Sequence, residues 1–244
     1  MAGRVATSFV GKTAQRWDKP GGAGPVTEAD LAVNDMLKTV LTLARPDYGW
    51  LSEETEDGAQ RLAHERVFIV DPIDGTRSFT EGANTWAHAI AVAEHGKVTA
   101  AVVYLPLLDL LYTAALGGGA YLNDAPIQAS AVTSFEEACI LAAKPALAGP
   151  IWAGGACPAF KPAYRPSLAY RLGLVGQAKF DAMLTLRPSW EWDIAAGALI
   201  ITEAGGTISN QRGAPLRFNN PDPRLDGVVA GGAHIHSALM DALA

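Results

Sequence analysis

Two aspartates in the first half of the chain have a spacing that could support chemistry. Asp71 and Asp74 follow the short apolar run 67–70 and belong to the segment Asp-Pro-Ile-Asp-Gly-Thr, which ends at Thr76. Because three residues span at most about 10 Å, both carboxylates can turn toward one point at the end of a strand. If Gly75 opens a helical turn, the N–H groups that follow it would face an anion held at that point. The segment therefore predicts a site for ions.

Two further acids stand at the ends of apolar elements, where loops commonly carry function. Glu53 follows the apolar pair Trp50-Leu51, and Asp193 opens a long apolar helix. Two unit charges about 4 Å apart repel by about 4 kcal/mol at an effective dielectric constant of 20, so converging carboxylates need protons or cations. All-oxygen ligands favour a hard ion such as Mg²⁺, which also binds waters and the phosphate of its substrate. A metal-bound phosphate beside the Thr76 hydroxyl, which can hold water, would be a site of hydrolysis.

Each acid also has a purely structural interpretation. Asp-Gly pairs are common in turns, Glu53 and Glu54 could lie on a solvated face, and Asp193 could favour a helix N-terminus. An EF-hand loop needs acids at alternate positions and a distant Glu, which residues 71–82 do not supply in full. The haloacid-dehalogenase phosphatases are the alternative hydrolase class, with Asp71 as a covalent nucleophile, although they place one residue rather than two between their aspartates.

The first half of the chain predicts a helix followed by a sheet. The helix covers 26–43, where Thr27 and Asp30 form a capping box and apolar residues recur at helical spacing. The strands, which we expect to pair antiparallel, are predicted at 67–70, 86–93, 98–105 and 110–114, with a glycine turn at 117–119.

The second half mixes helices and strands in blocks, which indicates an α+β class rather than a regular alternation. Helices are predicted at 167–175, at 194–204 before two glycines, and toward the end of the chain, with extended segments at 179–185, around Thr207 and at 227–230. The proline- and glycine-rich stretch 144–166 is the most linker-like part. We therefore expect an N-terminal α+β lobe over 1–143 that carries most metal ligands, and a C-terminal α/β lobe over 144–244 that supplies Asp193 and substrate contacts.

Composition limits the class of protein and of partner. The chain has 244 residues, 49% apolar and only 18% charged, so it can bury a core and disorder is excluded as its main state. The formal net charge of −6 argues against a nucleic-acid polymer, which needs a positive surface. Two cysteines are too few for a disulfide framework. Because we find neither an apolar run of about 20 residues nor the apolar core of a signal peptide, we expect no membrane partner and a cytoplasmic location.

Two segments together carry a resemblance to a known family. The segment 71–76 and the segment Trp-Asp-Ile-Ala-Ala-Gly at 192–197 resemble the signature pair of the inositol monophosphatase family. Ser-Glu-Glu at 52–54, Lys19 eleven residues before Asp30, and the glycine-closed helix that ends at 202–206 also fall in the family's order. The resemblance implies a layered α/β/α/β/α sandwich of the inositol monophosphatase and fructose-1,6-bisphosphatase type. It also implies a Mg²⁺-dependent, lithium-sensitive phosphomonoesterase with two or three ions per active site.

The resemblance further implies two metal positions that share Asp71. Glu53 and the backbone carbonyl of Ile73 would complete the first position, and Asp74 and Asp193 the second. Such a pair of ions would stabilise the entering and leaving oxygens of an in-line displacement, without a covalent intermediate.

The family's catalytic and substrate-binding roles fall on residues beside these ligands. Thr76, oriented by Asp30, would position the attacking water that Glu53 and the first metal activate. The N–H groups of Gly75 and Thr76 would hold the phosphate. The substrate contacts expected in full are Asp74, Gly75, Thr76, Arg77, Ser167 and Asp193.

Within the family, three segments look more like the CysQ-type 3′(2′),5′-bisphosphate nucleotidases than the inositol phosphatases. They are 191–193, 71–77 and 213–219, and Thr185 stands about where inositol-specific members have a sugar-binding glutamate. The resemblance thus implies hydrolysis of the 3′-phosphate of adenosine 3′,5′-bisphosphate. The alternative is an inositol-1-monophosphatase, or another sugar or histidinol phosphate phosphatase, with the same site. The expected partner is a small phosphorylated metabolite, and the assembly is left open between a monomer and a homodimer.

A second phosphate would need a local cation in a chain of net charge −6. Arg77, Arg171 and Lys179 are the candidates. Trp190 and Trp192 could stack on an adenine, because base stacking on aromatic rings contributes about 1 to 3 kcal/mol, although a buried apolar role is equally compatible with them.

Overall fold

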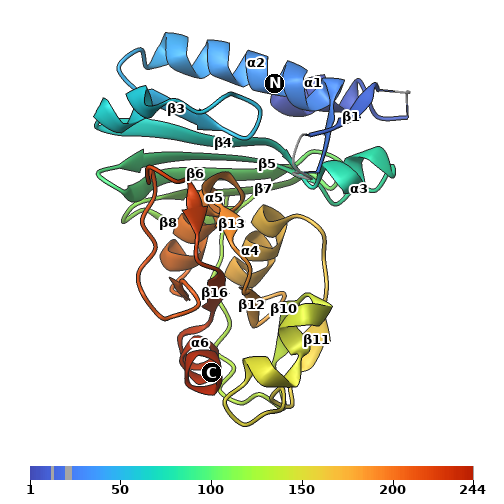
Figure 1. Cartoon of the computed structure of the whole chain (residues 1–244), viewed down its shortest axis with the longest axis vertical. Helices are drawn as coiled ribbons and strands as arrows, with labels where there is room; N and C mark the ends of the chain where they lie inside the picture. Colours follow the sequence, from blue (N-terminus) through green and yellow to red (C-terminus); the bar gives the residue numbers. More distant parts are fainter. Residues whose placement is uncertain (12–13, 20–23, 244) are drawn as a thin grey trace.

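The computed structural model describes residues 1–11, 14–19 and 24–243, and Figure 1 shows them as a stack of layers. The first layer holds α1 (Ala2–Thr7) and α2 (Glu28–Ala44), which cover one face of a seven-stranded sheet. The other face of that sheet packs on α4 (Leu168–Gly176) and α5 (Glu191–Glu203). A five-stranded sheet and α6 (Ala233–Ala242) complete the order, which confirms the predicted α/β/α/β/α sandwich.

The seven-stranded sheet has the order β3-β4-β5-β6-β7-β8-β9. Its strands are β3 (Gly49–Ser52), β4 (Arg66–Asp74), β5 (Ala87–Glu94), β6 (Lys97–Leu105), β7 (Leu110–Ala115), β8 (Gly119–Leu122) and β9 (Ala125–Pro126). From β4 to β9 every neighbouring pair is antiparallel, and only β3 runs parallel to β4. The four predicted strands are therefore confirmed as β4 to β7.

Strand β4 shows why this sheet is buried on both faces. Phe68 and Val70 pack against Val33 of α2, whereas Val67 and Ile69 point into the core shared with α4 and α5. This alternation is the two-residue period of a strand, and it sets which side chains at the end of β4 can face the second half of the chain.

The five-stranded sheet has the order β11-β10-β12-β16-β14. Its strands are β10 (Cys139–Ala142), β11 (Lys161–Ala163), β12 (Ala182–Thr185), β14 (Thr207–Ser209) and β16 (Val228–Gly231). In β10, Ile140 packs beside α6, whereas Leu141 packs on the side of α4 and α5. Strand β10 therefore belongs to the second sheet, although it precedes the lobe boundary expected between residues 143 and 144. The linker-like stretch after it contains the 3₁₀ turns η3 (Lys144–Leu147) and η4 (Gly149–Ile151) before β11.

Short elements complete the described chain. They are β1 (Arg16–Asp18) paired with β2 (Pro25–Thr27), β13 (Ser189–Trp190) paired with β15 (Arg224–Leu225), the 3₁₀ turn η2 (Ala59–Ala63) and the helix α3 (Thr76–Thr80). None of the helices in the described ranges is long and apolar enough to cross a membrane.

The observed helix boundaries show where local sequence patterns were sufficient to predict the start of a helix. The Thr27 and Asp30 capping box is present, and α2 begins at Glu28 as that box requires. The prediction that α5 begins at Ile194 was wrong, because the helix starts at Glu191. Glu191 and Asp193 both lie in its first turn, where acidic side chains interact favourably with the helix dipole.

Candidate active site

A β-bulge at the end of β4 brings Asp71 and Asp74 to one side of the sheet. Asp71 pairs with Ala89 of β5 and Asp74 with Ala87, so three residue steps on β4 oppose two on β5. In a regular strand, residues three apart face opposite sides, and the extra residue of a bulge removes that difference. Both aspartates therefore project toward the layer of α4 and α5.

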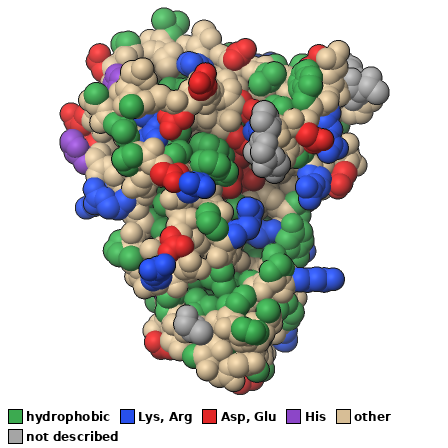
Figure 2. Space-filling model, viewed as in Figure 1, with side chains coloured by type: hydrophobic (Ala, Val, Ile, Leu, Met, Phe, Trp, Pro, Cys, Tyr) green, Lys and Arg blue, Asp and Glu red, His purple; other side chains and the backbone are tan. Residues whose placement is uncertain are grey.

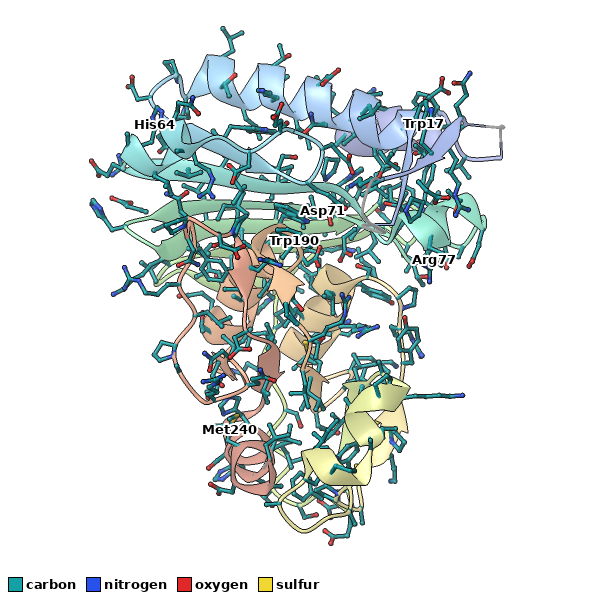
Figure 3. The ribbon with its side chains drawn as sticks, in the orientation of Figure 1. Trp17, His64, Asp71, Arg77, Trp190 and Met240 are labelled. Atoms are coloured by element: carbon teal, nitrogen blue, oxygen red, sulfur yellow. The ribbon has the colours of Figure 1, made fainter. Side chains whose placement is uncertain are left out.

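Asp193, in the first turn of α5, completes a group of three carboxylates. Asp71, Asp74 and Asp193 each offer an oxygen, and these oxygens lie within 4.8 Å of one another. Asp71 is 1% exposed and Asp74 is 7% exposed. Burial, and then the charges of neighbouring carboxylates, raise the pKa of Asp71 and of Asp193 well above the usual range. The side chains of the predicted second metal position are thus assembled (Figure 3 labels Asp71 beside the ends of α4 and α5).

These carboxylates fit a hard divalent cation. Oδ1 of Asp71 is buried and has no hydrogen-bond partner among the described residues. An unpaired carboxylate oxygen in the interior is costly unless a cation or a donor reaches it. Because all the donors are carboxylate oxygens, the arrangement suits Mg²⁺ better than a softer ion.

Asp74 also joins the first sheet to α4. Its Oδ2 accepts hydrogen bonds from Oγ of Ser167 at 2.7 Å and from the backbone N–H of Ala169 at 2.6 Å. Burial raises the pKa of Asp74 to about 6, while these two hydrogen bonds act in the opposite direction. Ser167 holds this position with a φ of 63°, a backbone conformation that is costly for a residue other than glycine and that clusters at functional sites. Ser167 therefore lies at the site, with its hydroxyl on Asp74.

Glu53 lies near this group but is held by a lysine. Nζ of Lys19 is 2.7 Å from Oε1 of Glu53 and 2.6 Å from Oε1 of Glu54. The negative charge of Glu53 still contributes to the raised pKa of Asp71, so the two carboxylates are neighbours. Burial, and then Glu53, raise the pKa of Glu54 to about 7, opposed by Lys19. The predicted first metal position thus has its acid nearby, with one oxygen in an ion pair.

Thr76 and Asp30 form the hydrogen-bonded pair that the sequence predicts. Oγ1 of Thr76 lies 3.0 Å from Oδ1 of Asp30 and 3.1 Å from the carbonyl oxygen of Ile73. The other oxygen of Asp30 accepts from the backbone N–H of Thr27 at 2.8 Å and from the Thr27 hydroxyl. All of these groups are buried, so the capping box of α2 also fixes the carboxylate that orients Thr76.

Gly75 joins β4 to α3 through a conformation that favours glycine. Its φ is 96°, and a Cβ at this position would lie 3.4 Å from Cβ of Ser167. A side chain here would be strained by the backbone and would crowd the acidic site. The turn directs the start of α3, including Thr76, toward the carboxylates.

A cavity of about 390 Å³ opens beside Asp74 and Asp193. Much of its wall is apolar, formed by Ala143, Pro145, Ala146, Ile151, Leu168, Leu184 and Leu186. Ser167 and Thr185 add hydroxyls, and Arg171 and Arg187 add positive charge. In Figure 2 acidic side chains lie in a recess near the centre of the visible face, with Lys and Arg side chains beside it.

The cations differ in their relation to this cavity. Arg171 is 6% exposed, and its guanidinium lies 4.5 Å from the centre of the Tyr164 ring, another residue of the cavity wall. Arg187, which the sequence analysis missed, is exposed in the segment between β12 and α5. Arg77 and Lys179 are exposed and are not among the residues that line the cavity (Figure 3 labels Arg77 out on α3). The position of Arg187 six residues before Asp193 is the signal that could have found it.

The two tryptophans stack on each other. The rings of Trp190 and Trp192 are 4.7 Å apart and nearly parallel, and the Arg224 guanidinium lies 5.6 Å from the Trp190 ring. They line a second cavity of about 420 Å³, which also includes Glu53. Trp192 is buried, as the apolar role requires, whereas Trp190 is 38% exposed and has Trp192 and the Arg224 guanidinium against its ring.

The sequence analysis also missed a buried network that holds the start of α5. Glu191 is fully buried and accepts backbone hydrogen bonds from Asn219 at 2.5 Å and from Asn220 at 2.9 Å. Arg61, from the first half of the chain, donates to the same two asparagines at 2.5 and 2.8 Å and to Asp57 at 2.6 Å. The network connects η2 to the first turn of α5 and so contributes to the placement of Asp193.

Comparison with known proteins agrees with this geometry. Residues 1–244 match the model of the inositol monophosphatase family. The chain is 34% identical to an inositol-1-monophosphatase of Mesorhizobium japonicum, over 89% of this chain and 82% of that protein. It is 32% identical to a 3′-phosphoadenosine 5′-phosphate phosphatase of Mycobacterium bovis, over 93% and 84% of the two chains.

A solved structure shares the whole layered arrangement. The extragenic suppressor protein suhB of Bartonella henselae superposes with a TM-score of 0.82 and is 30% identical, covering 98% of this chain and 92% of its own. The likeness therefore extends over both sheets and the helices between them.

Proposed function

The chain belongs to the inositol monophosphatase family, and on that premise we propose that it hydrolyses the 3′-phosphate of adenosine 3′,5′-bisphosphate with the assistance of Mg²⁺. As a member of this family it is a phosphatase. The finer assignment concerns the substrate and the roles of individual residues. The observation that carries it is the cavity beside Asp74 and Asp193, which combines an apolar wall with two arginines.

Asp71, Asp74, Asp193 and Glu53 are the residues that would hold Mg²⁺. When bound, Mg²⁺ supplies positive charge that stabilises the phosphoryl oxygens and lowers the pKa of water. The chain contributes a rigid frame for this charge, because Asp74 is fixed by α4 and Asp193 by the first turn of α5.

Thr76 and Asp30 are the residues that would place the attacking water. A carboxylate can only accept hydrogen bonds, so the Thr76 hydroxyl donates to Asp30 and keeps its lone pairs free for a water O–H. Asp30 is held from its other side by Thr27 and cannot turn away. Glu53 would take the proton from the water once Lys19 shares or releases the Glu53 carboxylate. The Gly75 turn would present its N–H groups to the phosphate oxygens.

The cavity wall favours a nucleoside bisphosphate over an inositol phosphate. Inositol presents hydroxyls on every side, and an apolar wall leaves buried hydroxyls without partners, which is costly. A purine and its ribose present a large apolar face and one further phosphate. Arg187 or Arg171 can bind that phosphate, and a charge-assisted hydrogen bond contributes about 1.5 to 3 kcal/mol.

The test compares two substrates on arginine variants. Arg187→Met keeps the side-chain stem and removes the charge, and Lys179→Met, an exposed cation outside the cavity wall, is the matched control. We expect Arg187→Met to lower kcat/KM for adenosine 3′,5′-bisphosphate by roughly ten- to a hundredfold. The value for inositol 1-phosphate should stay unchanged, and Lys179→Met should leave both substrates unaffected.

Inositol 1-phosphate is the second candidate substrate, supported by the 34% identity to an inositol-1-monophosphatase. A wild-type preference for inositol 1-phosphate would select it over the nucleotide. An equal loss for both substrates in Arg187→Met would show that Arg187 acts on the acidic group and not on a second phosphate.

A further inference from the structure

His88 lies on β5 opposite the bulge that brings Asp71 and Asp74 together. Ala89 and Ala87 of β5 pair with Asp71 and Asp74, and His88 is the single residue between them. His88 therefore faces the two residues between the aspartates, Pro72 and Ile73. A bulge leaves its extra residue outside the regular ladder of backbone hydrogen bonds. Here the side chain makes the missing contact, because Nδ1 of His88 lies 2.5 Å from the carbonyl oxygen of Pro72.

The surroundings of the imidazole determine which ring nitrogen carries its hydrogen. A carbonyl oxygen can only accept, so Nδ1 carries the hydrogen. His88 is 1% exposed, and its Nε2 is buried with no hydrogen-bond partner within the described ranges. Burial lowers the pKa of His88 to about 4, although the bond to Pro72 opposes this shift, so the ring is neutral near pH 7. The Trp86 ring, 5.5 Å away, and the Tyr104 ring, 6.3 Å away, pack on it.

We propose that His88 is a positioning residue of the metal site, whose Nδ1–H holds the Pro72 carbonyl and thereby fixes the bulge that sets the spacing of Asp71 and Asp74. Pro72 has no backbone N–H, so its carbonyl is the one main-chain group of this residue that needs a hydrogen-bond partner. Without the bond, the buried carbonyl would have to turn toward another donor. That turn would move the peptide between Asp71 and Asp74, the two metal ligands at the ends of the four-residue segment 71–74.

The inference rests on the metal site of the proposed function, and it goes beyond that function in assigning His88. A side chain that only filled space could be replaced by an apolar one of similar size. A side chain that holds the bulge must keep a donor at the δ position. His88→Leu and His88→Asn separate these roles, because Asn places its Nδ2–H₂ near the position of Nδ1.

The chain offers a matched control in His236 of α6. It is also buried, and its Nε2 lies 2.8 Å from Oγ of Ser209, in the layer farthest from the first sheet. His236→Leu therefore removes a buried histidine and its hydrogen bond without touching β4.

The experiment measures Mg²⁺ affinity from the rise in Tm during a Mg²⁺ titration of each full-length variant. Loss of groups that orient metal ligands typically costs 10- to 100-fold in affinity. We expect His88→Leu to need about tenfold more Mg²⁺ than wild type, His88→Asn to recover most of the affinity, and His236→Leu to lower Tm without changing the Mg²⁺ requirement. Equal Mg²⁺ affinity for wild type and His88→Leu would overturn the inference.

A failure of the proposed function would look different, because wild type itself would then show no Mg²⁺ stabilisation. Should His88→Leu not fold, nitrogen NMR of the wild-type imidazole decides. We expect the Nδ1–H tautomer, protected from exchange, with a resonance that shifts on Mg²⁺ binding. An Nε2–H tautomer, or a resonance that ignores Mg²⁺ while Tm responds, would contradict the role of His88.

Discussion

Replacing Asp193 with Asn should stabilise the metal-free protein while abolishing its response to Mg²⁺. Asp71, Asp74 and Asp193 place oxygens within 4.8 Å of one another, and at that distance two charges repel by about 3 kcal/mol at an effective dielectric constant of 20. Part of this repulsion is relieved by proton uptake, since the pKa of Asp193 is already raised by burial and by Asp74. We therefore expect a gain of about 2 kcal/mol, or roughly 4 to 8 °C in Tm for a chain of this length.

The assay is thermal unfolding at pH 7.5, once with a chelator and once with saturating Mg²⁺. Binding at one hundred times the dissociation constant stabilises wild type by about 2.7 kcal/mol, and Asp193→Asn should lose most of that gain together with its phosphatase activity. Asp35→Asn, at an exposed acid on α2, is the control and should match wild type in both conditions. The reasoning is refuted if Asp193→Asn is less stable than wild type in chelator, or if Mg²⁺ stabilises both equally.

Three further results are expected from the same site. Thr76→Val should lower kcat by about 10² to 10⁴ while the Mg²⁺-induced rise in Tm persists, and a matching loss of that rise would show that Thr76 acts on the metal rather than the water. The pKa values of Asp74, about 6, and Glu54, about 7, are raised, so the folded protein binds these protons more tightly than the unfolded chain. The stability of the metal-free protein should therefore fall as pH rises from 6 to 8, and Mg²⁺ should reduce that fall. A metal-free Tm that rises between pH 6 and 8 contradicts this expectation. Acid quenching during turnover should yield no phosphorylated Asp71, whose appearance would favour the covalent alternative.

Local patterns were sufficient for the elements that hold the acids. The capping box of α2 was readable because Thr27 and Asp30 are three residues apart, and the apolar run before Asp71 indicated a buried strand. The resemblance to the family then placed Asp193 beside Asp71 and Asp74, which the structure brings together. Each of these inferences used either neighbours in the chain or a complete family motif.

Contacts between distant segments were not readable in the same way. The bond from His88 to the Pro72 carbonyl depends on strand register, and Arg61 reaches its asparagine partners across 158 residues of sequence. Lys179 follows the nine-residue helix α4, which at 1.5 Å per residue separates it from Ser167 by about 13 Å. The sequence offered Arg171 and Lys179 as equivalent cations, and only the direction of α4 shows that Arg171 lines the cavity and Lys179 does not.

Metal-dependent phosphate release tests the account most directly. Wild-type protein would be incubated with adenosine 3′,5′-bisphosphate, inositol 1-phosphate, fructose 1,6-bisphosphate and histidinol phosphate, each with Mg²⁺ and with excess chelator. We predict Mg²⁺-dependent release of phosphate, fastest from adenosine 3′,5′-bisphosphate, and none in chelator. Release that continues at full rate in chelator, or no release from any of the four esters with Mg²⁺, would contradict a phosphatase site built on Asp71, Asp74 and Asp193.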